Sequence, residues 1–221
     1  MLSAFDCGNR REQQELEEIT TEVEYQRGDT VFQQGAPGLG LYFVFEGKVK
    51  LVHRTSQAKS FMFKIAGPGD MIGLPVLFSK TTYSSYAETL SPSRIGFLKK
   101  DDFFEFLREY PSMMFQCCDW LSEELITFRL KLVEASYAGS KQRICRLLTQ
   151  LENETLESRN IRNILAQLTG VSYKTVIQVL KELEEREFIR MEKNNVWVED
   201  VQSLRRIAKD FPLELSLKAM I

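Results

Sequence analysis

The segment that decides the fold is LAQLTGVSYKTVIQVLKELEEREFI (Leu165–Ile189). A short helical pattern over Arg162–Leu168 ends before Gly170, and Ser172 stands where its hydroxyl can cap a second helix that continues to about Glu185. Two helices joined by a tight turn that contains a glycine are typical of a helix-turn-helix, so we expect one here.

The second helix has a polar face whose chemistry suits DNA. Val176 and Leu180 fit inward packing. Tyr173, Lys174 and Gln178 then fall on the opposite side, near the start of the helix, which is the part of a recognition helix that reaches base edges. Glutamine and lysine can read base edges, whereas hydroxyl groups and arginine can bond phosphates. The residues expected at a DNA interface are Arg162, Ser172, Tyr173, Lys174, Thr175 and Gln178.

The next segment predicts a β wing. EFIRMEKNNVWVED (Glu187–Asp200) has two short strand patterns joined at Asn194–Asn195, a pair that tolerates the positive φ of a tight turn. A packing helix pair with a solvated polar face is the alternative to a DNA-binding unit. A helix-turn-helix followed by a wing is more specific than either part alone, so DNA binding is favoured. Asp200 can cap a further helix in the tail.

Ahead of these helices, residues 25–98 predict short strands separated by glycine turns. LYFVFEGKVKLVHR (Leu41–Arg54) indicates two strands joined tightly at Glu46–Gly47. This pattern is typical of an antiparallel β sandwich or roll. DDFFEFLREYP (Asp101–Pro111) then predicts a helix that its first acids can cap and that the proline ends. The expected fold class is therefore α+β, with a jelly-roll-like antiparallel part first.

A long helix is expected over Ser112–Ala138, which contains neither glycine nor proline. Apolar residues recur there every seven residues in two series that are offset by four, which is the pattern of an a/d seam. The predicted dimer interface consists of Met114, Cys118, Leu121, Leu125, Phe128, Leu132 and Ala135. The alternative is a helix packed only on its own domain, but its apolar seam is longer than one small β domain can cover.

Composition narrows the class of protein. The chain has 221 residues, of which 43% are hydrophobic, and a formal net charge of −2. No segment approaches the roughly 20 apolar residues that span a bilayer, and the N-terminus has no secretory pattern, so we expect a cytoplasmic protein without a membrane partner. Residues 1–138 contain 15 Lys or Arg against 19 Asp or Glu, and residues 139–221 contain 14 against 12. The sign of this shift suits a C-terminal part that meets an anion.

Cofactor and enzyme chemistry are not expected. His53 is the only histidine, and the four cysteines form no metal-ligand pattern, so we predict no metal and no cofactor. The role of Cys117 and Cys118 stays open between reduced packing thiols and a redox pair. No catalytic triad, metal cluster or P-loop is recognisable, so the chain is not expected to be an enzyme.

A β roll, a long helix and a winged helix-turn-helix, in this order, resemble the CRP/FNR family of bacterial transcription regulators. The specific pieces are GDTVFQQGAPGLGLYFVFEGKVKL, GPGDMIGLPVLF and the helix-turn-helix segment. The resemblance implies a homodimer that binds promoter DNA, contacts RNA polymerase and is controlled by an effector in the β roll. It implies an effector-type β roll over residues 1–110, a dimerisation helix over 111–138 and a winged helix-turn-helix over 139–221.

The segment MIGLPVLFSKTTYSSYA aligns with the phosphate-binding cassette of this family. Cyclic-nucleotide binders of the family place a Gly-Glu pair there, and an Arg-Ser pair some ten residues later. The resemblance assigns the glutamate to the ribose hydroxyl and the arginine to the cyclic phosphate. Here Gly73 keeps the glycine, but Leu74 replaces the glutamate. Ser84 stands at the place of the arginine, and Ser85 keeps its type.

These replacements predict no physiological response to cAMP or cGMP. A buried phosphate without a cation carries a penalty of several kcal/mol. Pro75 offers no N–H to an anion. The candidates for an effector pocket are Gly73, Leu74, Ser84, Ser85, Phe128 and Arg129. Two alternatives stay open: Tyr83, Tyr86, Leu74 and Phe128 line a small apolar pocket, or they fill the space of the former one.

The resulting hypothesis is a homodimeric, sequence-specific transcription regulator with an altered or absent effector. Its recognition helix departs from the Arg-Glu pattern of well-known members, so the operator should differ from a TGTGA-type half-site and still be roughly palindromic. The alternative is an adaptor that senses a ligand or a protein through a cyclic-nucleotide-domain fold and does not act on DNA.

Overall fold

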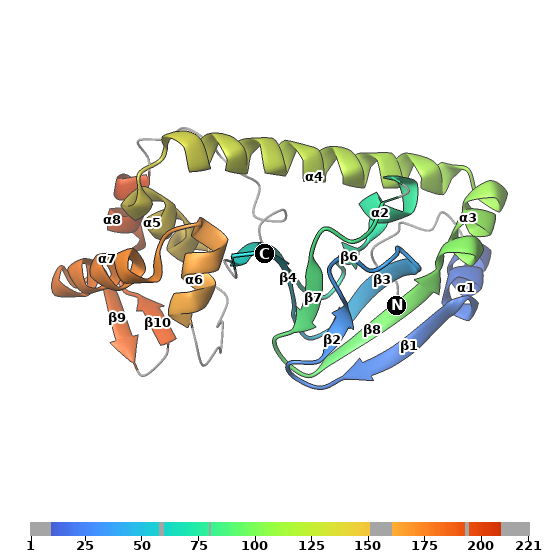
Figure 1. Ribbon diagram of the computed structural model, residues 1–221, viewed down its shortest axis with the longest axis horizontal. Helices are drawn as coiled ribbons and strands as arrows, with labels where there is room; N and C mark the ends of the chain where they lie inside the picture. The colour runs from blue at the N-terminus through green and yellow to red at the C-terminus, as the bar shows by residue number, and fades with distance from the viewer. Residues whose placement is uncertain (1–9, 58–59, 80, 151–160, 193–194, 209–221) are drawn as a thin grey trace. The chain divides into compact units, whose positions relative to one another are not determined.

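The computed structural model describes residues 10–57, 60–79, 81–150, 161–192 and 195–208 (Figure 1). The chain divides into two compact units, and the boundary between Leu125 and Ile126 falls inside one long helix, α4 (Ser112–Tyr137). The predicted α+β class is confirmed, because two antiparallel sheets are followed by the long helix and then by helices with a small β hairpin. None of the helices described is both long and apolar enough to cross a bilayer.

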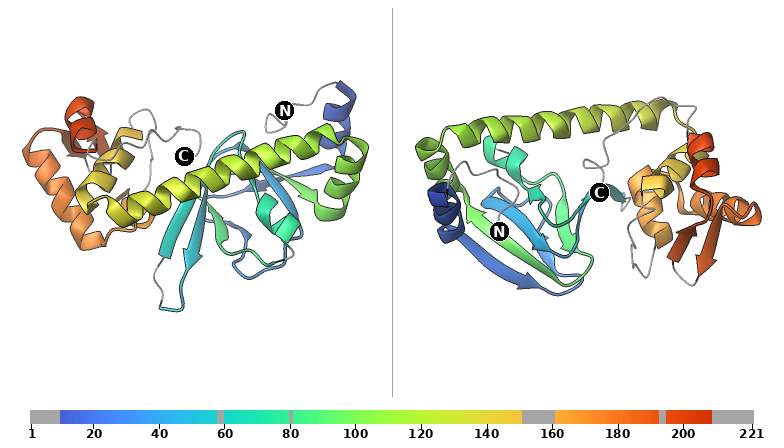
Figure 2. Two further views of the ribbon diagram at one scale, coloured as in Figure 1. Left: turned by 90° about the horizontal axis from the view of Figure 1, so that it is seen from above. Right: turned by 180° about the vertical axis from the view of Figure 1, so that it is seen from behind.

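The first unit contains two four-stranded antiparallel sheets (Figure 2). Their strand orders are β1-β8-β3-β6 and β2-β7-β4-β5. The strands are β1 Thr20–Tyr25, β2 Thr30–Phe32, β3 Gly40–Glu46, β4 Val49–Arg54, β5 Ser60–Ala66, β6 Met71–Ile72, β7 Tyr86–Thr89 and β8 Ser93–Lys99. An apolar cluster that includes Phe32, Tyr42 and Ile95 forms the core of the roll.

The two tightly joined strands predicted around Glu46–Gly47 are confirmed as β3 and β4, which do not pair with each other. Strand β3 pairs with β8 and β6, whereas β4 pairs with β5 and β7, so this turn carries the chain from one sheet to the other. Gly47 has φ 89°, and a Cβ there would collide with Ser93. Alternation of apolar residues cannot reveal this, because a strand has the same pattern whether it pairs with its neighbour in sequence or faces it across the core.

Three short helices accompany the sheets: α1 Arg10–Glu18, α2 Leu74–Ser79 and α3 Lys100–Glu109. The predicted acid cap of α3 is wrong, because Lys99 is the N-cap residue and its side chain makes no cap hydrogen bond. Asp101 and Asp102 lie in the first turn instead, where their charge complements the positive end of the helix dipole. The helix ends at Glu109, two residues before the proline, as expected.

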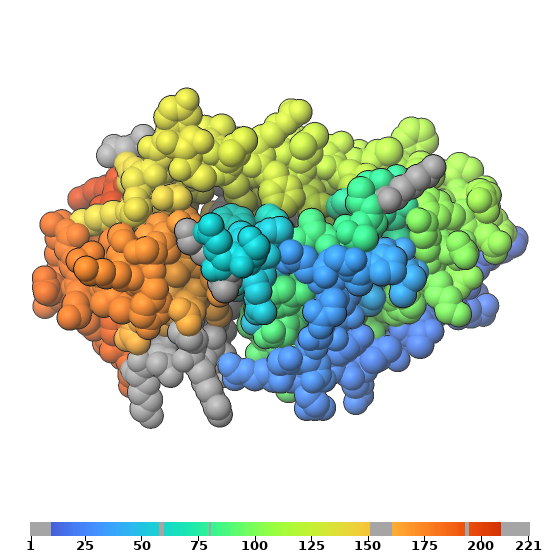
Figure 3. Space-filling view, in the orientation of Figure 1, coloured from blue at the N-terminus to red at the C-terminus, as the bar shows by residue number. Residues whose placement is uncertain are grey.

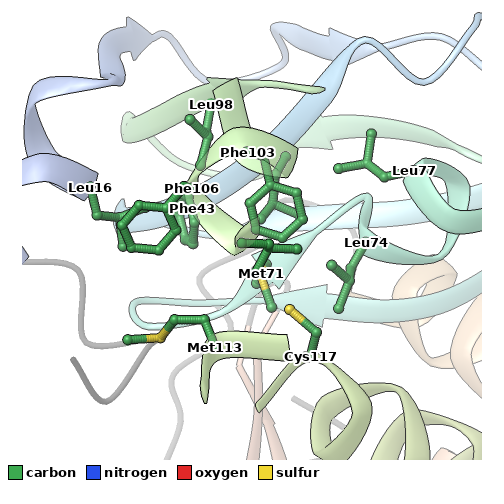
Figure 4. Close-up of a cluster of buried hydrophobic side chains, with 12 residues drawn as sticks. Leu16, Phe43, Met71, Leu74, Leu77, Leu98, Phe103, Phe106, Met113 and Cys117 are labelled. Atoms are coloured by element: carbon green, nitrogen blue, oxygen red, sulfur yellow. The ribbon is translucent and has the colours of Figure 1, made fainter. Parts of the chain in front are cut away.

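A second core cluster joins these helices to the first sheet and to the start of α4 (Figure 4). It contains Leu16, Leu41, Phe43, Met71, Leu74, Leu77, Leu98, Phe103, Phe106, Leu107, Met113 and Cys117, all at most 4% exposed. Trp120 packs against its edge. The cassette residues therefore lie at the junction of the β roll and the N-terminal half of α4.

The second unit begins with the end of α4 and continues with four helices and one hairpin. These are α5 Ser140–Gln150, α6 Ile161–Thr169, α7 Tyr173–Glu185, β9 Ile189–Glu192, β10 Asn195–Val198 and α8 Val201–Ala208. Helix α5 packs against α6, α7 and α8. The predicted cap of the tail helix is confirmed, because Asp200 Oδ1 accepts a hydrogen bond from Ser203 N at 2.9 Å.

Candidate nucleic-acid interface and effector cassette

Helix α7 is anchored at its start and along one face. Ser172 has an extended backbone, and its Oγ accepts a hydrogen bond from Thr175 N at 3.1 Å, which satisfies one of the free amides of the first turn. The inward side chains are at most 7% exposed and are Val176, Val179, Leu180 and Leu183. The second helix of the motif therefore has the orientation that the sequence predicts.

The opposite face of α7 is open. Tyr173 is 45% exposed, and Lys174 and Gln178, one helical turn apart, are also exposed. Thr175 is half-buried, and its hydroxyl lies 2.8 Å from the hydroxyl of Ser172, so these two residues form the cap. Arg162 is half-buried on α6. The structure thus gathers five of the six expected DNA-binding residues at the start of α7 and places the sixth on the preceding helix.

The turn between α6 and α7 is held by hydrogen bonds and by a glycine. Thr169 Oγ1 donates to Leu165 O at 2.6 Å within α6, and Arg143 Nη1 donates to Thr169 O at 2.9 Å from α5. Gly170 then adopts φ 65°, the left-handed region that ends many helices. These contacts fix where α6 stops, and therefore where α7 starts.

The predicted wing is present and is tied to α7. Strands β9 and β10 pair antiparallel next to α7 (Figure 1). Met191 N donates to Glu184 Oε1 at 2.9 Å, which links the wing to the last turn of α7. Of the pair expected at the turn, Asn195 lies in strand β10 and pairs with Glu192 in the ladder. The residue before it lies outside the described part of the chain.

Sequence reasoning missed two buried charged residues of this unit. Glu134 on α4 and Arg146 on α5 have side chains only 9% exposed, and Arg146 Nη1 lies 3.5 Å from Glu134 Oε1. Burial raises the pKa of the Glu134 carboxyl above its ordinary value of 4.5, although Arg146, Arg143 and Lys131 favour its charged form. A heptad pattern predicts a solvated face for such residues, and no sequence signal separates a buried ion pair from two surface charges.

In the first unit, the backbone of the cassette keeps its special geometry. Gly73 has φ 100°, and a Cβ at this position would lie 3.2 Å from Gly40 O and 3.5 Å from the Tyr83 ring. A positive φ and a close approach both require glycine. The shape of this turn therefore depends on Gly73.

Leucine and serine occupy the two cassette positions where the resemblance places a carboxylate and a guanidinium. Leu74 is 3% exposed and packs beside Met71 and Leu77 in the apolar cluster (Figure 4). Ser84 is exposed, and its carbonyl oxygen lies 2.6 Å from His53 Nδ1. Ser85 is 6% exposed. The leucine is part of the core, so it does not stand in for a ligand-binding carboxylate.

Tyr83 fills the interior next to the cassette. It is 4% exposed, stacks on Phe32 with ring centroids 3.9 Å apart, and donates its hydroxyl hydrogen to Gly40 O at 3.0 Å. Burial raises the pKa of the Tyr83 phenol well above its ordinary value. Tyr86 is half-buried, with the guanidinium of Arg54 5.3 Å above its ring. Of the two alternatives, an apolar pocket or a filled space, Tyr83 fits the filled space because it is buried and packed on both Phe32 and Gly40.

The expected seam of α4 lies on its outer side. Leu125, Phe128 and Leu132 are 52%, 40% and 68% exposed, and side chains of α4 project outward along one edge of the space-filling view (Figure 3). Met114, Cys118 and Ala135 are exposed as well, and Leu121 is half-buried. Arg129, the remaining pocket candidate, is also exposed. The helix turns a different stripe inward, which includes Met113, Cys117, Thr127 and Glu134.

Comparison with known proteins agrees with both units. Residues 22–110 match the family model of the cyclic nucleotide-binding domain, and residues 142–207 match that of the Crp-like helix-turn-helix domain. A CRP-like cAMP-activated global transcriptional regulator of Mycobacterium tuberculosis is 29% identical over 196 residues, which cover 85% of this chain and 88% of that protein. The Cyclic AMP receptor protein of Thermus thermophilus is 28% identical over 186 residues, or 83% and 86% of the two chains.

A solved structure supports the same fold. The c-di-GMP-responsive global regulator CLP of Xanthomonas campestris superimposes with a TM-score of 0.77 at 20% identity, over 86% of this chain and 99% of that one. The β roll, the long helix and the winged helix-turn-helix define a transcription regulator with a helix-turn-helix DNA-binding domain. The chain belongs to the CRP/FNR family of bacterial transcription regulators.

Proposed function

We propose that this protein is a homodimeric, sequence-specific DNA-binding regulator that does not respond to cAMP. The observation that carries the DNA-binding part is the capped start of α7, where Tyr173, Lys174 and Gln178 are exposed on a helix whose other face is buried. Polar side chains at the start of a recognition helix reach base edges in the major groove. We also propose the division into residues 1–110, 111–138 and 139–221.

DNA recognition is tested by selecting preferred sequences from random DNA and measuring binding by fluorescence anisotropy. Gln178→Ala should relax the preference at one base position, because a bidentate contact is worth about 1–3 kcal/mol of discrimination. Gln202→Ala, an exposed glutamine on α8, is the matched control and should leave the preference unchanged. Selection of no preferred sequence by the wild type would refute DNA recognition and favour the adaptor alternative.

Contacts to phosphates have a separate signature. Arg162→Ala should weaken binding to all sequences and reduce the slope of log K against log salt by about 1. Arg27→Ala, which removes an exposed arginine from the β roll, controls for net charge. Equal salt slopes for Arg162→Ala and the wild type would show that this arginine does not touch the DNA backbone.

The homodimer is supported by the outer seam of α4. Burying one large apolar side chain contributes about 1.5–3 kcal/mol, and the seam offers several such side chains to a second copy. Leu132→Asp should therefore convert the dimer to a monomer in analytical ultracentrifugation. Tyr137→Asp is the matched control, because Tyr137 is 78% exposed but lies away from the a/d series. A wild-type chain that sediments as a monomer would sink the proposal.

The absence of a cAMP response rests on the cassette. Two relatives are named for cAMP, so a cAMP response is the rival expectation. A charged hydrogen bond contributes about 1.5–3 kcal/mol, so losing the carboxylate and the guanidinium costs about 3–6 kcal/mol, or roughly 10²–10⁴-fold in affinity. Leu74, which stands where cyclic-nucleotide binders of the family have the glutamate, packs in the apolar core. Micromolar cAMP binding in a calorimetric titration would overturn this proposal.

Control of transcription through contact with RNA polymerase, in the cytoplasm, completes the proposal. This part of the proposal is supported by the match of residues 142–207 to the Crp-like helix-turn-helix domain, which stands beside a second compact unit in the same chain. In vitro transcription from a selected site should change when the protein is added, and Gln178→Ala should reduce that change. An unaltered transcript level at saturating protein would contradict a regulatory role at that site.

A further inference from the structure

Helix α5 carries three basic side chains that contact different elements of the second unit. Lys141 Nζ forms an ion pair with Glu182 Oε1 on α7. Arg143 Nη1 donates to Thr169 O, the last residue of α6, at 2.9 Å. Two of the three contacts therefore join α5 to the two helices of the DNA-reading motif.

The third basic residue, Arg146, is the most enclosed. Its side chain and that of Glu134 are each 9% exposed, and Nη1 lies 3.5 Å from Glu134 Oε1 near the end of α4. Its Nη2 donates to Ala208 O at 3.1 Å, at the end of α8. One guanidinium group thus contacts α4 and α8 and is itself part of α5.

The connection between α4 and α5 is short and contains a glycine. Only Ala138 and Gly139 separate the two helices. Ala138 N donates to Glu134 O at 2.9 Å, so Glu134 lies in the last hydrogen-bonded turn of α4. Gly139 N donates to Gln142 Oε1 at 2.8 Å, which is an exposed contact. Gly139 O also accepts a hydrogen bond from Arg143 N at 3.1 Å, so Ala138 belongs to α4 and Gly139 to α5, and no backbone hydrogen bond among the described residues joins one helix to the other across this link.

We propose that Glu134 and Arg146 are positioning residues for DNA binding, whose buried ion pair sets the angle at which α5 leaves α4. Because α5 packs against α6 and α7 and also contacts them through Lys141 and Arg143, the same pair orients the recognition helix. Two buried charges are costly unless they stay paired, so this ion pair fixes the distance between α4 and α5 at that point, whereas apolar contacts have no preferred direction. This inference rests on the proposed function, since it names what aims the DNA-reading face.

Single substitutions cannot separate positioning from folding. Removing one partner leaves an uncompensated buried charge, which destabilises the fold strongly. Replacing both partners by apolar residues of similar volume is often neutral for stability. The double variant Glu134→Leu/Arg146→Met should therefore stay folded, with a melting temperature close to that of the wild type, but lose the charge pair that links α5 to α4. Arg11→Met/Glu109→Leu, which removes an exposed ion pair of the first unit, is the matched control.

The first experiment measures orientation without DNA. Spin labels are attached at Tyr137→Cys on α4 and Lys181→Cys on α7, in a background in which Cys7 and Cys118 are replaced by serine. Labelled chains are diluted with unlabelled protein so that only distances within one chain are read by double electron–electron resonance. The parent should give one narrow distance, and the apolar double variant should give a shifted or broadened one. Identical distance distributions would overturn the proposal.

The second experiment measures binding to a selected DNA site and to random DNA. The apolar double variant should lose at least tenfold in affinity for the selected site, while its affinity for random DNA stays unchanged, because non-specific phosphate contacts depend less on a fixed orientation. Wild-type affinity for the selected site in this variant would refute a positioning role. Failure of the wild type to select any DNA would refute the proposed function instead, and the spin-label distances would still decide the inference.

Discussion

Tyr83→Phe tests whether the interior around Tyr83, next to Gly73 of the cassette, is a packed core. The substitution removes one hydroxyl group and keeps the ring that stacks on Phe32. The hydroxyl is buried and donates to Gly40 O at 3.0 Å, so its loss leaves that buried carbonyl without this donor. Leaving a buried polar group unsatisfied costs about 1–3 kcal/mol. The melting temperature of a chain of this size should fall by about 2–4 °C for each kcal/mol.

A larger change should have a larger effect. Tyr83→Ala also removes the ring, and such truncations in a packed core cost about 3–5 kcal/mol. Tyr86→Phe is the control, because Tyr86 is half-buried in the next strand and the same atom is removed. Its unfolding free energy should change less than that of Tyr83→Phe.

The assay can be restricted to the first unit. The chain has two tryptophans, of which Trp120 packs against the core of the first unit and Trp197 lies on the wing. In a Trp197→Phe background, tryptophan fluorescence during urea or thermal unfolding therefore reports the β roll and the start of α4. The four chains to be compared are the background itself, Tyr83→Phe, Tyr83→Ala and Tyr86→Phe.

The result that would refute the reasoning is a Tyr83→Ala chain as stable as its parent. It would mean that Tyr83 borders an open, hydrated space, and the apolar-pocket alternative would then replace the packed one. A destabilised Tyr83→Ala chain with an unchanged Tyr83→Phe chain would retain the packing but show that the hydrogen bond to Gly40 contributes nothing.

Three further predictions concern a turn, two thiols and one carboxyl group. Gly73→Ala should destabilise the first unit by about 1–3 kcal/mol in urea unfolding, because φ is 100° there, whereas Gly67→Ala, with no atom within 4 Å of the added Cβ, should be near neutral. Burial raises the pKa of the Cys117 thiol to about 12 and that of the Cys145 thiol to about 11. Both thiols should therefore resist alkylation by iodoacetamide near pH 8 in the folded protein. Rapid alkylation of either cysteine, detected by peptide mapping, would contradict its burial. The pKa of the Glu134 carboxyl is raised on folding, so the folded state binds its proton more tightly than the unfolded state. The unfolding free energy of the wild type relative to Glu134→Gln should therefore rise as pH falls through the raised pKa towards 4.5. A difference that does not depend on pH would show that the carboxyl is not buried.

The sequence by itself determined the order of the parts and the chemistry of the reading face. A capping serine, a glycine in the left-handed region and an apolar stripe act over a few residues, so Ser172, Gly170 and Val176 predict the helix-turn-helix before any tertiary contact forms. The heptad series on α4 predicts a dimer interface from spacing alone, and most of its members are exposed in the single chain.

Only the tertiary structure decided which side chains meet across long separations. The chain from β3 into β4 changes sheet at Gly47, Tyr83 reaches Gly40, and Arg146 reaches Glu134. Such contacts depend on the packing of whole elements, since a strand or helix face has one local pattern whichever partner covers it. For the same reason the sequence leaves Leu74 open between lining an apolar pocket and filling its space, and the packing of α2, α3 and α4 places it in the apolar core.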